Sequence, residues 1–526
     1  MEVGMKRINL VELCDNFRGS MLALCLLCST IYAFAQGQNY LLQLLQSDFR
    51  VNDDSGNASQ LAPAAAMAND GSFVITWYDE RNDKSDIFAQ RYEAAGTRIA
   101  ANFQVTDISS SKSHYYPMEP NIAIDMNRNF IIAWDDFRSS ADIYAQRYQN
   151  SGLPISSNFK AHDSLSLHGF ASAVAMNGAG AFALAWVDNS ASYFQRFDQE
   201  GQRLGEVIKM TNPDEYFNSP AILLDEDSNL ITIGLGISYS NSSSIYSQRF
   251  NSSGLPHGSA LKISSANTGA GGGYTYFNMT ATATDAYGNY IVVWRDSRNG
   301  NADIYAQRFD SSGTALGDNF KVNDDLGVAA QSAPSTAMDL PGNCIIVWTD
   351  KRDGNSDIYG QFYDKDGKAI GSNYKVTRET NASNQSAPSV AMKDGKILTV
   401  WQDDRESSRG SDIWANITEY SISGVGQVED LTVPGKIMLS QNYPNPFNPS
   451  TRINYWLSES SMTELAIFNS TGQRIVTLIS THQPAGFHTA FWNGCNEKGV
   501  QAPSGIYLAK LFSMNSVKVK KMIYIK

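Results

Sequence analysis

Cysteine and histidine are scarce in this chain of 526 residues. Three of its five cysteines, Cys14, Cys25 and Cys28, lie near the N-terminus, which leaves Cys344 and Cys495 in the body. Cys344 falls in a predicted buried strand and Cys495 in a distant C-terminal segment, so a disulfide framework is not supported. The six histidines and the cysteines show no zinc-ligand spacing.

Short catalytic motifs are also missing. The sequence contains no His-Glu-x-x-His, no Gly-x-Ser-x-Gly and no P-loop. Two acidic turns, residues 52–56 and 323–327, offer oxygen ligands that suit calcium, but neither matches an EF-hand loop. Because acidic turns are usually only hydrated, we expect no catalytic residue, no metal and no cofactor, with calcium at these turns as the alternative.

Positive charge is in short supply in the middle of the chain. The net charge is −12; the first 36 residues are neutral and the residues from 425 onward carry +4, which leaves −16 for the part between them. Nucleic-acid binding draws mainly on Lys and Arg contacts with phosphates. We therefore expect no DNA or RNA partner.

One apolar run, residues 21–35, indicates targeting. It follows two basic residues and ends in Ala-Phe-Ala before Gln36, the pattern of a secretory signal peptide with its cleavage site. The run is too short to cross a bilayer comfortably. Residues 1–36 are thus predicted to be a signal peptide for Sec export, and no transmembrane segment is expected. A lipid anchor at Cys28 is disfavoured because Leu27 precedes it instead of a small residue.

The chain is rich in one repeated unit of about fifty residues. Its clearest copy, residues 345–361, reads Ile-Ile-Val-Trp-Thr-Asp-Lys-Arg, then a short loop, then Asp-Ile-Tyr-Gly-Gln. The central position of the unit recurs after 57, 52, 48, 60, 54 and 53 residues. Its seven occurrences are Trp77, Trp134, Trp186, Gly234, Trp294, Trp348 and Trp401. A period near fifty predicts a propeller, solenoid or array.

Each unit carries signals for four strands separated by Gly, Asn, Asp and Ser. The second strand is apolar without alternation, which indicates burial on both faces, and the first is rich in small residues, which suit the crowded wall of a central channel. These features predict a monomeric, all-β, seven-bladed propeller over residues 37–420. The strand at 49–52 precedes the first unit and the seventh lacks an outer strand, so we expect the N-terminal strand to close the last blade.

A different domain is expected after a Gly/Ser/Val-rich linker at 421–438. Residues 439–526 read as six or seven short strands, hence a small β-sandwich. They include Asn-Tyr-Pro-Asn-Pro-Phe-Asn-Pro at 442–449, Ser-Gly-Ile-Tyr at 504–507 and a Lys-Lys-Met end at 520–522. In this order and spacing, the segment resembles the type A C-terminal sorting domain of the type IX secretion system, which is similar to the immunoglobulin-like module of the flagellar hook-capping protein.

The resemblance implies a Bacteroidota-type bacterium and partners in the type IX secretion machinery. It also implies Sec export followed by passage through the outer membrane, with the protein released or attached to the cell surface. Cys495 departs from the Asp or Ser that is frequent in the family. A plain accessory sandwich domain is the alternative.

Five units keep an Asp two residues and an Arg four residues after the Trp. The set consists of Trp77, Asp79, Arg81, Trp134, Asp136, Arg138, Trp294, Asp296, Arg298, Trp348, Asp350, Arg352, Trp401, Asp403 and Arg405. Several arginines around a channel could hold a carboxylate, as in a sialidase, but the Ser-x-Asp-x-Gly-x-x-x-Trp box of sialidase blades is missing. Residues repeated in most blades favour a structural role, with the Arg pairing with the Asp to hold the hairpin.

The repeat breaks in units two to five, where the segment before the first strand becomes aromatic. The residues concerned are Tyr115, Tyr116, Phe170, Tyr216, Phe217, Tyr274 and Tyr276. Aromatic rings beside amides are typical of sugar-binding surfaces, so we expect a ligand on this face; alternatively, the rings plug the channel or pack between blades. The sequence favours a secreted or cell-surface binding or adhesion protein for a glycan or a surface protein. A secreted glycan hydrolase of sialidase type and a structural spacer are the alternatives.

Overall fold

The computed structural model describes most of the chain. The described residues are 32–33, 39–81, 84–107, 110–111, 119–136, 141–162, 169–188, 191–210, 215–238, 243–264, 280–379, 382–393, 395–406, 410–423, 437–439, 442, 447–457, 460–484, 486–514 and 516–525. No helix long and apolar enough to cross a membrane occurs in these segments.

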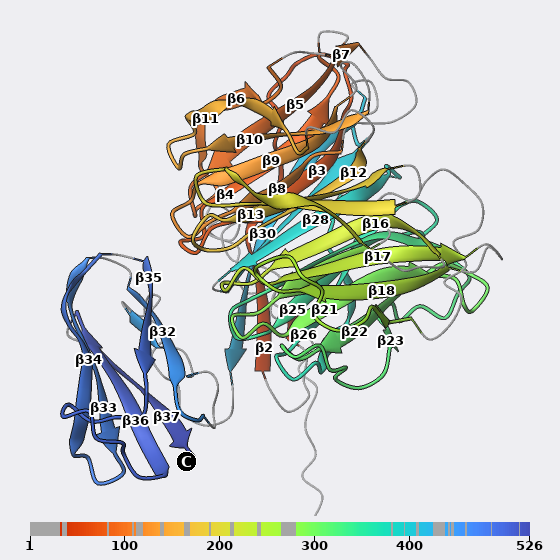
Figure 1. The fold of residues 1–526 in the computed structure, drawn as a ribbon. Coiled ribbons are helices and arrows are strands. Elements are labelled where there is room, and N and C mark those ends of the chain that lie inside the picture. Colours follow the sequence, from red (N-terminus) through yellow and green to blue (C-terminus); the bar gives the residue numbers. More distant parts are fainter. Residues whose placement is uncertain are drawn as a thin grey trace, which may run out of the picture.

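Seven antiparallel sheets of four strands follow one another as the blades of a propeller, which confirms the predicted fold class (Figure 1). Blade 1 has β3 (Gln60–Met67), β4 (Phe73–Asp79), β5 (Lys84–Tyr92) and β6 (Arg98–Gln104), and β7 (Ser110–Ser111) pairs with β5. Blade 2 has β8 (Asn121–Ile124), β9 (Phe130–Asp136), β10 (Asp142–Tyr148) and β11 (Pro154–Lys160). Blade 3 has β12 (Phe170–Met176), β13 (Phe182–Asp188), β14 (Ala191–Phe197) and β15 (Arg203–Lys209).

The remaining blades repeat this order from the channel outward. Blade 4 has β16 (Glu215–Leu224), β17 (Leu230–Ser238), β18 (Ser243–Phe250) and β19 (Leu261–Lys262). Blade 5 has β20 (Thr280–Thr284), β21 (Tyr290–Asp296), β22 (Asp303–Phe309) and β23 (Phe320–Lys321). Blade 6 has β24 (Gln331–Met338), β25 (Cys344–Asp350), β26 (Asp357–Tyr363) and β27 (Ala369–Lys375). Blade 7 has β28 (Gln385–Lys393), β29 (Lys396–Asp403), β30 (Asp412–Ser423) and, from the N-terminus, β2 (Asn39–Arg50).

The outer strand of blade 7 thus comes from the other end of the propeller sequence. β2 pairs antiparallel with β30 from Asn39 opposite Ser423 to Arg50 opposite Trp414, and β1 (Tyr32–Ala33) pairs with β2. This strand is much longer than the four residues expected at 49–52, because β30 continues beyond the length of the other third strands and offers it more partners. The pairing covers an edge that would otherwise be open.

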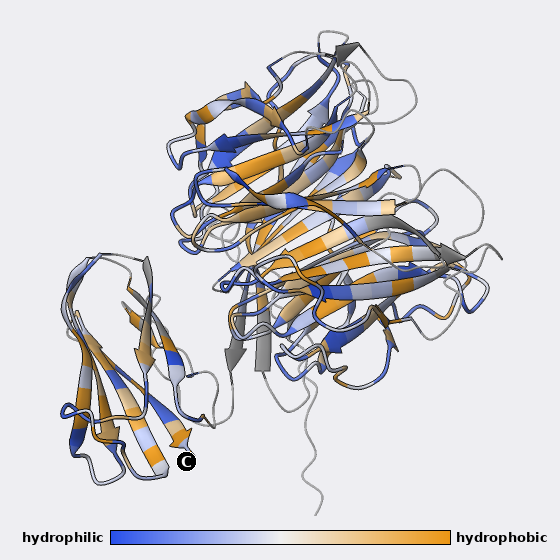
Figure 2. Ribbon diagram, in the orientation of Figure 1, coloured by the Kyte–Doolittle hydropathy of each residue, from blue (hydrophilic) through white to orange (hydrophobic). Residues whose placement is uncertain are grey.

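The hydrophobic core of the propeller lies between blades. Every residue of the second strands β4, β9, β13 and β25 is buried, as the lack of alternation predicted. Among the described residues, seven clusters of buried apolar side chains occupy the seven interfaces between neighbouring blades. In Figure 2, much of the orange that marks hydrophobic residues accordingly lies on the strands, while many of the connecting turns are blue and hydrophilic.

Two faces of the propeller follow from the strand order. The first strand of each blade starts, and the second strand ends, at the same end of the sheet, because neighbouring strands are antiparallel. We call this end, which carries the Trp-x-Asp-x-Arg hairpins and the connections between blades, the upper face. The turns between first and second strands lie on the lower face.

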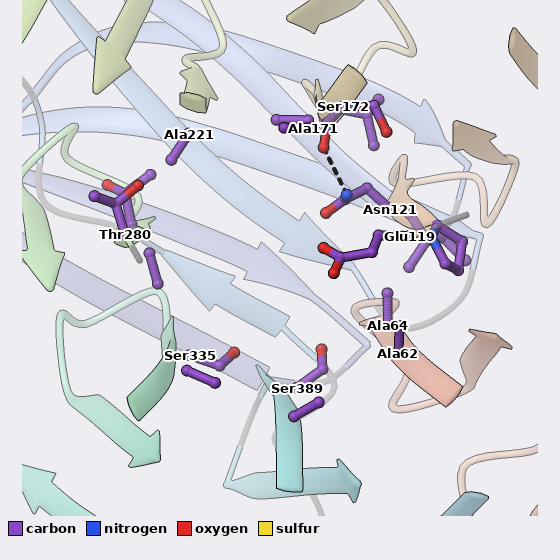
Figure 3. Close-up of a pocket in the computed structure, with 18 of the residues that line it drawn as sticks. Ala62, Ala64, Glu119, Asn121, Ala171, Ser172, Ala221, Thr280, Ser335 and Ser389 are labelled. Carbon is purple, nitrogen blue, oxygen red and sulfur yellow. Dashed lines mark hydrogen bonds between the residues drawn. The ribbon is translucent and has the colours of Figure 1, made fainter. Parts of the chain in front are cut away.

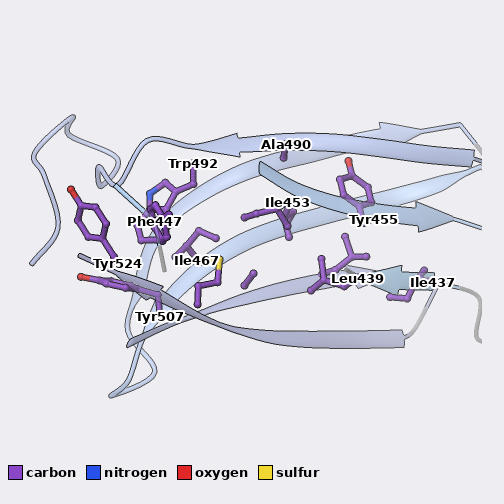
Figure 4. Close-up of a cluster of buried hydrophobic side chains, with 14 of the residues drawn as sticks. Ile437, Leu439, Phe447, Ile453, Tyr455, Ile467, Ala490, Trp492, Tyr507 and Tyr524 are labelled. Carbon is purple, nitrogen blue, oxygen red and sulfur yellow. The ribbon is translucent and has the colours of Figure 1, made fainter. Parts of the chain in front are cut away.

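The C-terminal segment forms the immunoglobulin-like sandwich, also as predicted. One sheet has the order β31 (Ile437–Leu439), β32 (Thr451–Leu457), β35 (Gly486–Trp492). The other has the order β34 (Arg474–Gln483), β33 (Ser461–Asn469), β36 (Gly505–Ser513), β37 (Ser516–Tyr524). Buried side chains from both sheets, among them Ile453, Ile467 and Trp492, fill the space between them (Figure 4).

Candidate ligand-binding channel

The first strands of all seven blades surround one cavity of about 280 Å³. Its wall uses residues from the start to just past the middle of these strands, so the cavity occupies the upper and middle parts of the central channel. Small residues prevail, as the sequence led us to expect, and the polar side chains are mostly hydroxyls, with one amide and one carboxylate (Figure 3). The polar lining residues are Glu119, Asn121, Ser172, Thr280, Thr282, Ser335, Thr336 and Ser389.

Bulges shape this wall. Ala62, Ala171, Ala333 and Ala387 have positive φ values of 48°, 54°, 48° and 50°, and the register of the first strand shifts at each of them. Non-glycine residues rarely adopt this conformation. Bulges unpair backbone groups and redirect side chains, which brings the small residues of the Ala-Pro segments to the channel surface.

Two of the bulges are held by a side chain of the preceding blade. Asp135, directly after Trp134, accepts hydrogen bonds from the backbone N–H groups of Ala171 and Ser172 at 2.8 and 3.0 Å. Gln402, directly after Trp401, accepts one from the N–H of Ala62 at 3.1 Å. Burial raises the pKa of Asp135 to about 6 although these N–H groups favour its ionised form. Asp135 therefore places a carboxylate just behind the channel wall.

Side chains of the wall also connect neighbouring blades. Asn121 donates from Nδ2 to the carbonyl of Ser172 at 2.7 Å. Ser335 Oγ accepts the N–H of Val390 at 3.1 Å, and Ser389 Oγ accepts that of Ala65 at 3.2 Å. A serine hydroxyl that accepts in this way keeps its own proton for donation. The bonds to the next blade thus fix the positions of groups that face the channel.

The repeated Trp, Asp and Arg residues meet at the upper hairpin of their own blade. Trp348 donates from Nε1 to Asp350 Oδ2 at 2.8 Å, and the backbone N–H of Arg352 donates to Oδ1 at 2.9 Å. The guanidinium of Arg352 donates to Oδ2 at 2.9 Å and lies 4.3 Å from the ring centre of Tyr359. Arg81, Arg298 and Arg405 bind Asp79, Asp296 and Asp403 in the same way. Trp134 donates to Asp136 at 2.9 Å, whereas Arg138 lies outside the described residues.

These bonds determine the charge state of the buried carboxylate. Burial opposes ionisation of Asp350, but hydrogen bonds from the Arg352 and Trp348 side chains outweigh it and lower the pKa. The Arg352 guanidinium also contacts Asp324 at 2.8 Å in the turn that enters the blade. In the four blades where the structure describes it, this arginine is therefore engaged by its own blade and turned to an aspartate, not to the channel.

A second set of repeated residues, which the sequence interpretation overlooked, connects the blades. The Gln of the Asp-Ile-Tyr-Ala-Gln segment bonds the outer strand of its own blade: Gln361 Nε2 donates to the carbonyl of Ile370 at 3.0 Å. The Arg that follows the Gln in blades 1 to 5 donates to backbone carbonyls in the next blade, in the turn between its third and fourth strands, which also lies on the lower face. These arginines are Arg91, Arg147, Arg196, Arg249 and Arg308. The repeated Gln-Arg pair was the signal that could have revealed them.

The turns that receive these arginines need glycine. At Gly367, φ is +82°, and a Cβ atom would lie 2.1 Å from Arg308 Nη1. No such turn exists in blade 7, because its outer strand comes from the N-terminus. The residue that follows the Gln in blade 6 is accordingly Phe362, which packs against Tyr420.

The structure describes three of the seven aromatic residues that were predicted for ligand binding. Phe170 begins β12 at the upper end and is half-buried. Tyr216 and Phe217 lie in the first part of β16, opposite Ile237 and Gly236. The four tyrosines at 115, 116, 274 and 276 lie outside the described residues. Phe170 thus lies next to Ala171 of the channel wall, and Tyr216 and Phe217 precede wall residue Pro220 on the same strand.

Comparison with known proteins concerns both parts of the chain. Residues 449–516 match the family FlgD Ig-like domain. No curated protein matches the sequence. A protein of unknown function from Dyadobacter fermentans is 9% identical, with a TM-score of 0.43, over 72% of this chain and 99% of its own.

Two further solved structures resemble the chain. A polysaccharide lyase, an ulvan lyase bound to a glucuronate-containing oligosaccharide, is 12% identical with a TM-score of 0.47 over 70% of this chain and 95% of its own. PorZ, a surface component of the type IX secretion system of Porphyromonas gingivalis, is 12% identical with a TM-score of 0.28 over 94% of this chain and 74% of its own. At these identities the likeness concerns the fold alone.

Proposed function

We propose that this chain is a glycan-binding or adhesion protein of the bacterial cell surface. The upper face of the propeller binds the ligand and the C-terminal domain directs export by the type IX secretion system. The observation that carries the binding role is the cavity of about 280 Å³ in the central channel, with a polar lining that consists mainly of hydroxyl side chains. This volume is near the lower end of the roughly 300–1,000 Å³ of small-molecule sites.

The position of the aromatic residues supports the same face. Phe170 and the pair Tyr216 and Phe217 lie at the start of strands that form the wall of the cavity. An aromatic ring offers a flat apolar surface with low conformational entropy, which suits the apolar face of a sugar. The repeated arginines are occupied by aspartates, so the binding hypothesis is favoured over a sialidase-like hydrolase.

A glycan array with the purified full chain, beside a hydrolysis screen on the same glycans, tests the function. Binding without turnover supports the proposal, turnover supports the hydrolase, and silence in both favours a structural spacer. Single replacement of Tyr115, Tyr216 and Tyr276 by Ala should weaken binding by roughly ten-fold with an unchanged melting temperature, since a ring contact contributes about 1 kcal/mol or more. Loss of stability without a specific loss of binding would mean that these rings are core residues.

Export is tested separately in a bacterium with a type IX secretion system. Deletion of Leu439–Lys526 should leave the protein in the periplasm, because the sorting signal is proposed to lie there. Cell fractionation measures the outcome, and a variant that lacks only residues 426–433 of the linker serves as control. Appearance of the truncated protein on the surface or in the medium would contradict this role.

A further inference from the structure

The residue after the repeated tryptophan, or after Gly234 in blade 4, differs from blade to blade. In chain order, the seven residues are Tyr78, Asp135, Val187, Leu235, Arg295, Thr349 and Gln402. Asp135 and Gln402 both accept hydrogen bonds from backbone N–H groups in the first-strand bulge of the next blade. Asp135 is the one carboxylic acid of the seven. Of these two bulges, that of blade 3 is therefore the one held by a side chain that gains or loses a proton near pH 6.

The bulge of blade 3 uses both oxygens of Asp135, which is only 2% exposed. Oδ2 accepts the N–H of Ala171 and Oδ1 accepts that of Ser172. Ala171 has a φ of 54°, a conformation that a residue with a Cβ keeps only where the surrounding structure holds it. Asn121 holds the other side of Ser172 by donating to its carbonyl (Figure 3). Two side chains of blade 2 thus fix this part of the wall, and one of them titrates.

A proton on Asp135 removes part of this support. An ionised carboxylate accepts hydrogen bonds through both oxygens, whereas a carboxylic acid carries a hydrogen on one of them. Because each oxygen of Asp135 faces its own N–H donor, that hydrogen leaves one of the two N–H groups without its charge-assisted acceptor. The amide of Gln402 does not titrate, so the bond at Ala62 is the same at either pH.

Other charged or titratable groups lie near Asp135, on the elements packed against it at the upper ends of blades 2 and 3. Those among the described residues are Glu119, Asp136, Asp142, Lys160, His162 and Asp188. Lys160 and His162 contact Asp142 at 2.7 and 3.9 Å, and β12 carries no titratable side chain. Burial raises the pKa of Asp135 against the hydrogen bonds from the bulge, and none of these six groups contributes to the shift.

Resting on the proposed binding role of the channel, we propose that Asp135 is a positioning residue of this site: when ionised it holds Ala171 and Ser172 in the wall, and when protonated it releases them. Both residues line the cavity, and Phe170, one of the aromatic residues predicted to bind the ligand, directly precedes Ala171. Acidification thus changes the wall where the ligand is proposed to bind. The chain holds its glycan near pH 7 and releases it near pH 5.

Hydrogen exchange of the full chain, measured by mass spectrometry at pH 7 and pH 5 and corrected for the intrinsic exchange rate, tests this inference. Between these values the ionised fraction of Asp135 falls from about nine-tenths to about one-tenth. Protection of the Ala171 and Ser172 amides should fall about ten-fold, because an N–H group loses a charged acceptor. The Ala62 amide, bonded to Gln402, is the internal control and should not change.

Asp135→Asn keeps the size of the side chain and removes its titration. In this variant the amides of Ala171 and Ser172 should be as weakly protected at pH 7 as those of the wild type at pH 5. A global loss of stability does not account for such a result, because the raised pKa of Asp135 makes its contribution to stability increase as the pH falls from 7 to 5.

The glycan array, read at both pH values, measures the consequence for binding. Each glycan bound at pH 7 should bind about ten-fold more weakly at pH 5, and Asp135→Asn should bind it equally weakly at both. Wild-type protection or glycan affinity that is equal at both pH values would overturn the inference, as would a pH dependence that survives in Asp135→Asn. If the variant fails to fold, the wild-type contrast between Ala171 and Ala62 decides alone. A chain that binds no glycan at either pH overturns the proposed function, while hydrogen exchange still decides the role of Asp135.

Discussion

Two interfaces between blades of the propeller are packed with side chains of different size. Between blades 5 and 6, large side chains meet: Trp348, Tyr359 and Tyr363 pack against Ile291 and Val293. Between blades 3 and 4, the tryptophan position is Gly234, and four alanines of blade 3 face Ile222, Leu224 and Phe250. These alanines are Ala173, Ala175, Ala183 and Ala185.

The two interfaces nevertheless share their bonds on the lower face. Arg196 of blade 3 donates to Ser253 of the next lower turn, as Arg308 of blade 5 donates to Lys365. The Trp-Asp-Arg bonds of the upper hairpin exist in blade 6 and have no sequence counterpart in blade 4. The ring therefore keeps its lower connections in the five pairs from blades 1 and 2 to blades 5 and 6 and varies its upper face, which is where a ligand site can change without loss of the fold.

The largest loss of stability is expected from a substitution in the interface between blades 5 and 6, where large side chains meet. Trp348→Ala should lower the free energy of unfolding by about 3–5 kcal/mol, because it removes a fully buried ring and leaves a cavity. Chemical denaturation followed by circular dichroism measures this. As a control, Leu224→Ala in the interface that has no tryptophan should cost less, about 2–3 kcal/mol; an equal or larger cost there would remove the distinction between the interfaces.

The second largest loss of stability is expected in the upper hairpin of blade 6. Arg352→Ala should destabilise by about 1–3 kcal/mol, because buried Asp350 loses its cationic partner. Glycan binding by the folded protein should persist. A variant with wild-type stability and no binding would show instead that Arg352 contacts the ligand.

Asp350 and Asp135 are expected to make the stability of the propeller depend on pH in opposite directions. The lowered pKa of Asp350 means that its stabilisation is present above the unfolded pKa near 3.8 and is lost as the pH falls through the folded value. Asp135 has a raised pKa of about 6, so stability declines as the pH rises from about 4 to about 6. Asp135→Asn should remove that decline. The stability difference between wild type and variant should therefore change by about 1–3 kcal/mol across this window, and a constant difference would contradict the prediction.

The smallest effect is expected on the lower face. Arg308→Ala should cost about 0.5–1 kcal/mol, because its bonds to the next turn are partly hydrated. Thermal unfolding of this variant can be compared with Phe362→Arg, which places an arginine before the one blade that lacks the receiving turn. That exchange should cost more, since Phe362 is buried; a neutral Phe362→Arg would mean that the turn is not what the arginine requires.

The sequence predicted the blades because their signal is local and repeated seven times. Small residues before the bulges predicted the inner wall, and the unalternating apolar runs predicted burial on both faces. The Arg308 connection was not predicted although its Gln-Arg pair is repeated, because the partner is a backbone carbonyl 57 residues away and a carbonyl leaves no sequence signature of its own. Glu119 and Asp135 were not predicted for another reason: each occurs in one blade only, whereas a repeat is recognised by the residues that its units share.

The pairing of β2 with β30 has a mechanical consequence. β30 is hydrogen-bonded on one side to β29 and on the other to β2, and the chain leaves it toward the C-terminal domain. A pull between a ligand on the upper face and an anchor at the C-terminus would run along β30, so both rows of hydrogen bonds would be loaded together in shear. A pull between the start of β2 and the end of β30 would instead open the β2–β30 ladder one bond at a time, because Asn39 and Ser423 lie opposite each other at the same end of the pair. The ring is thus expected to resist force better between its upper face and its C-terminal end than between these two ends of the propeller chain.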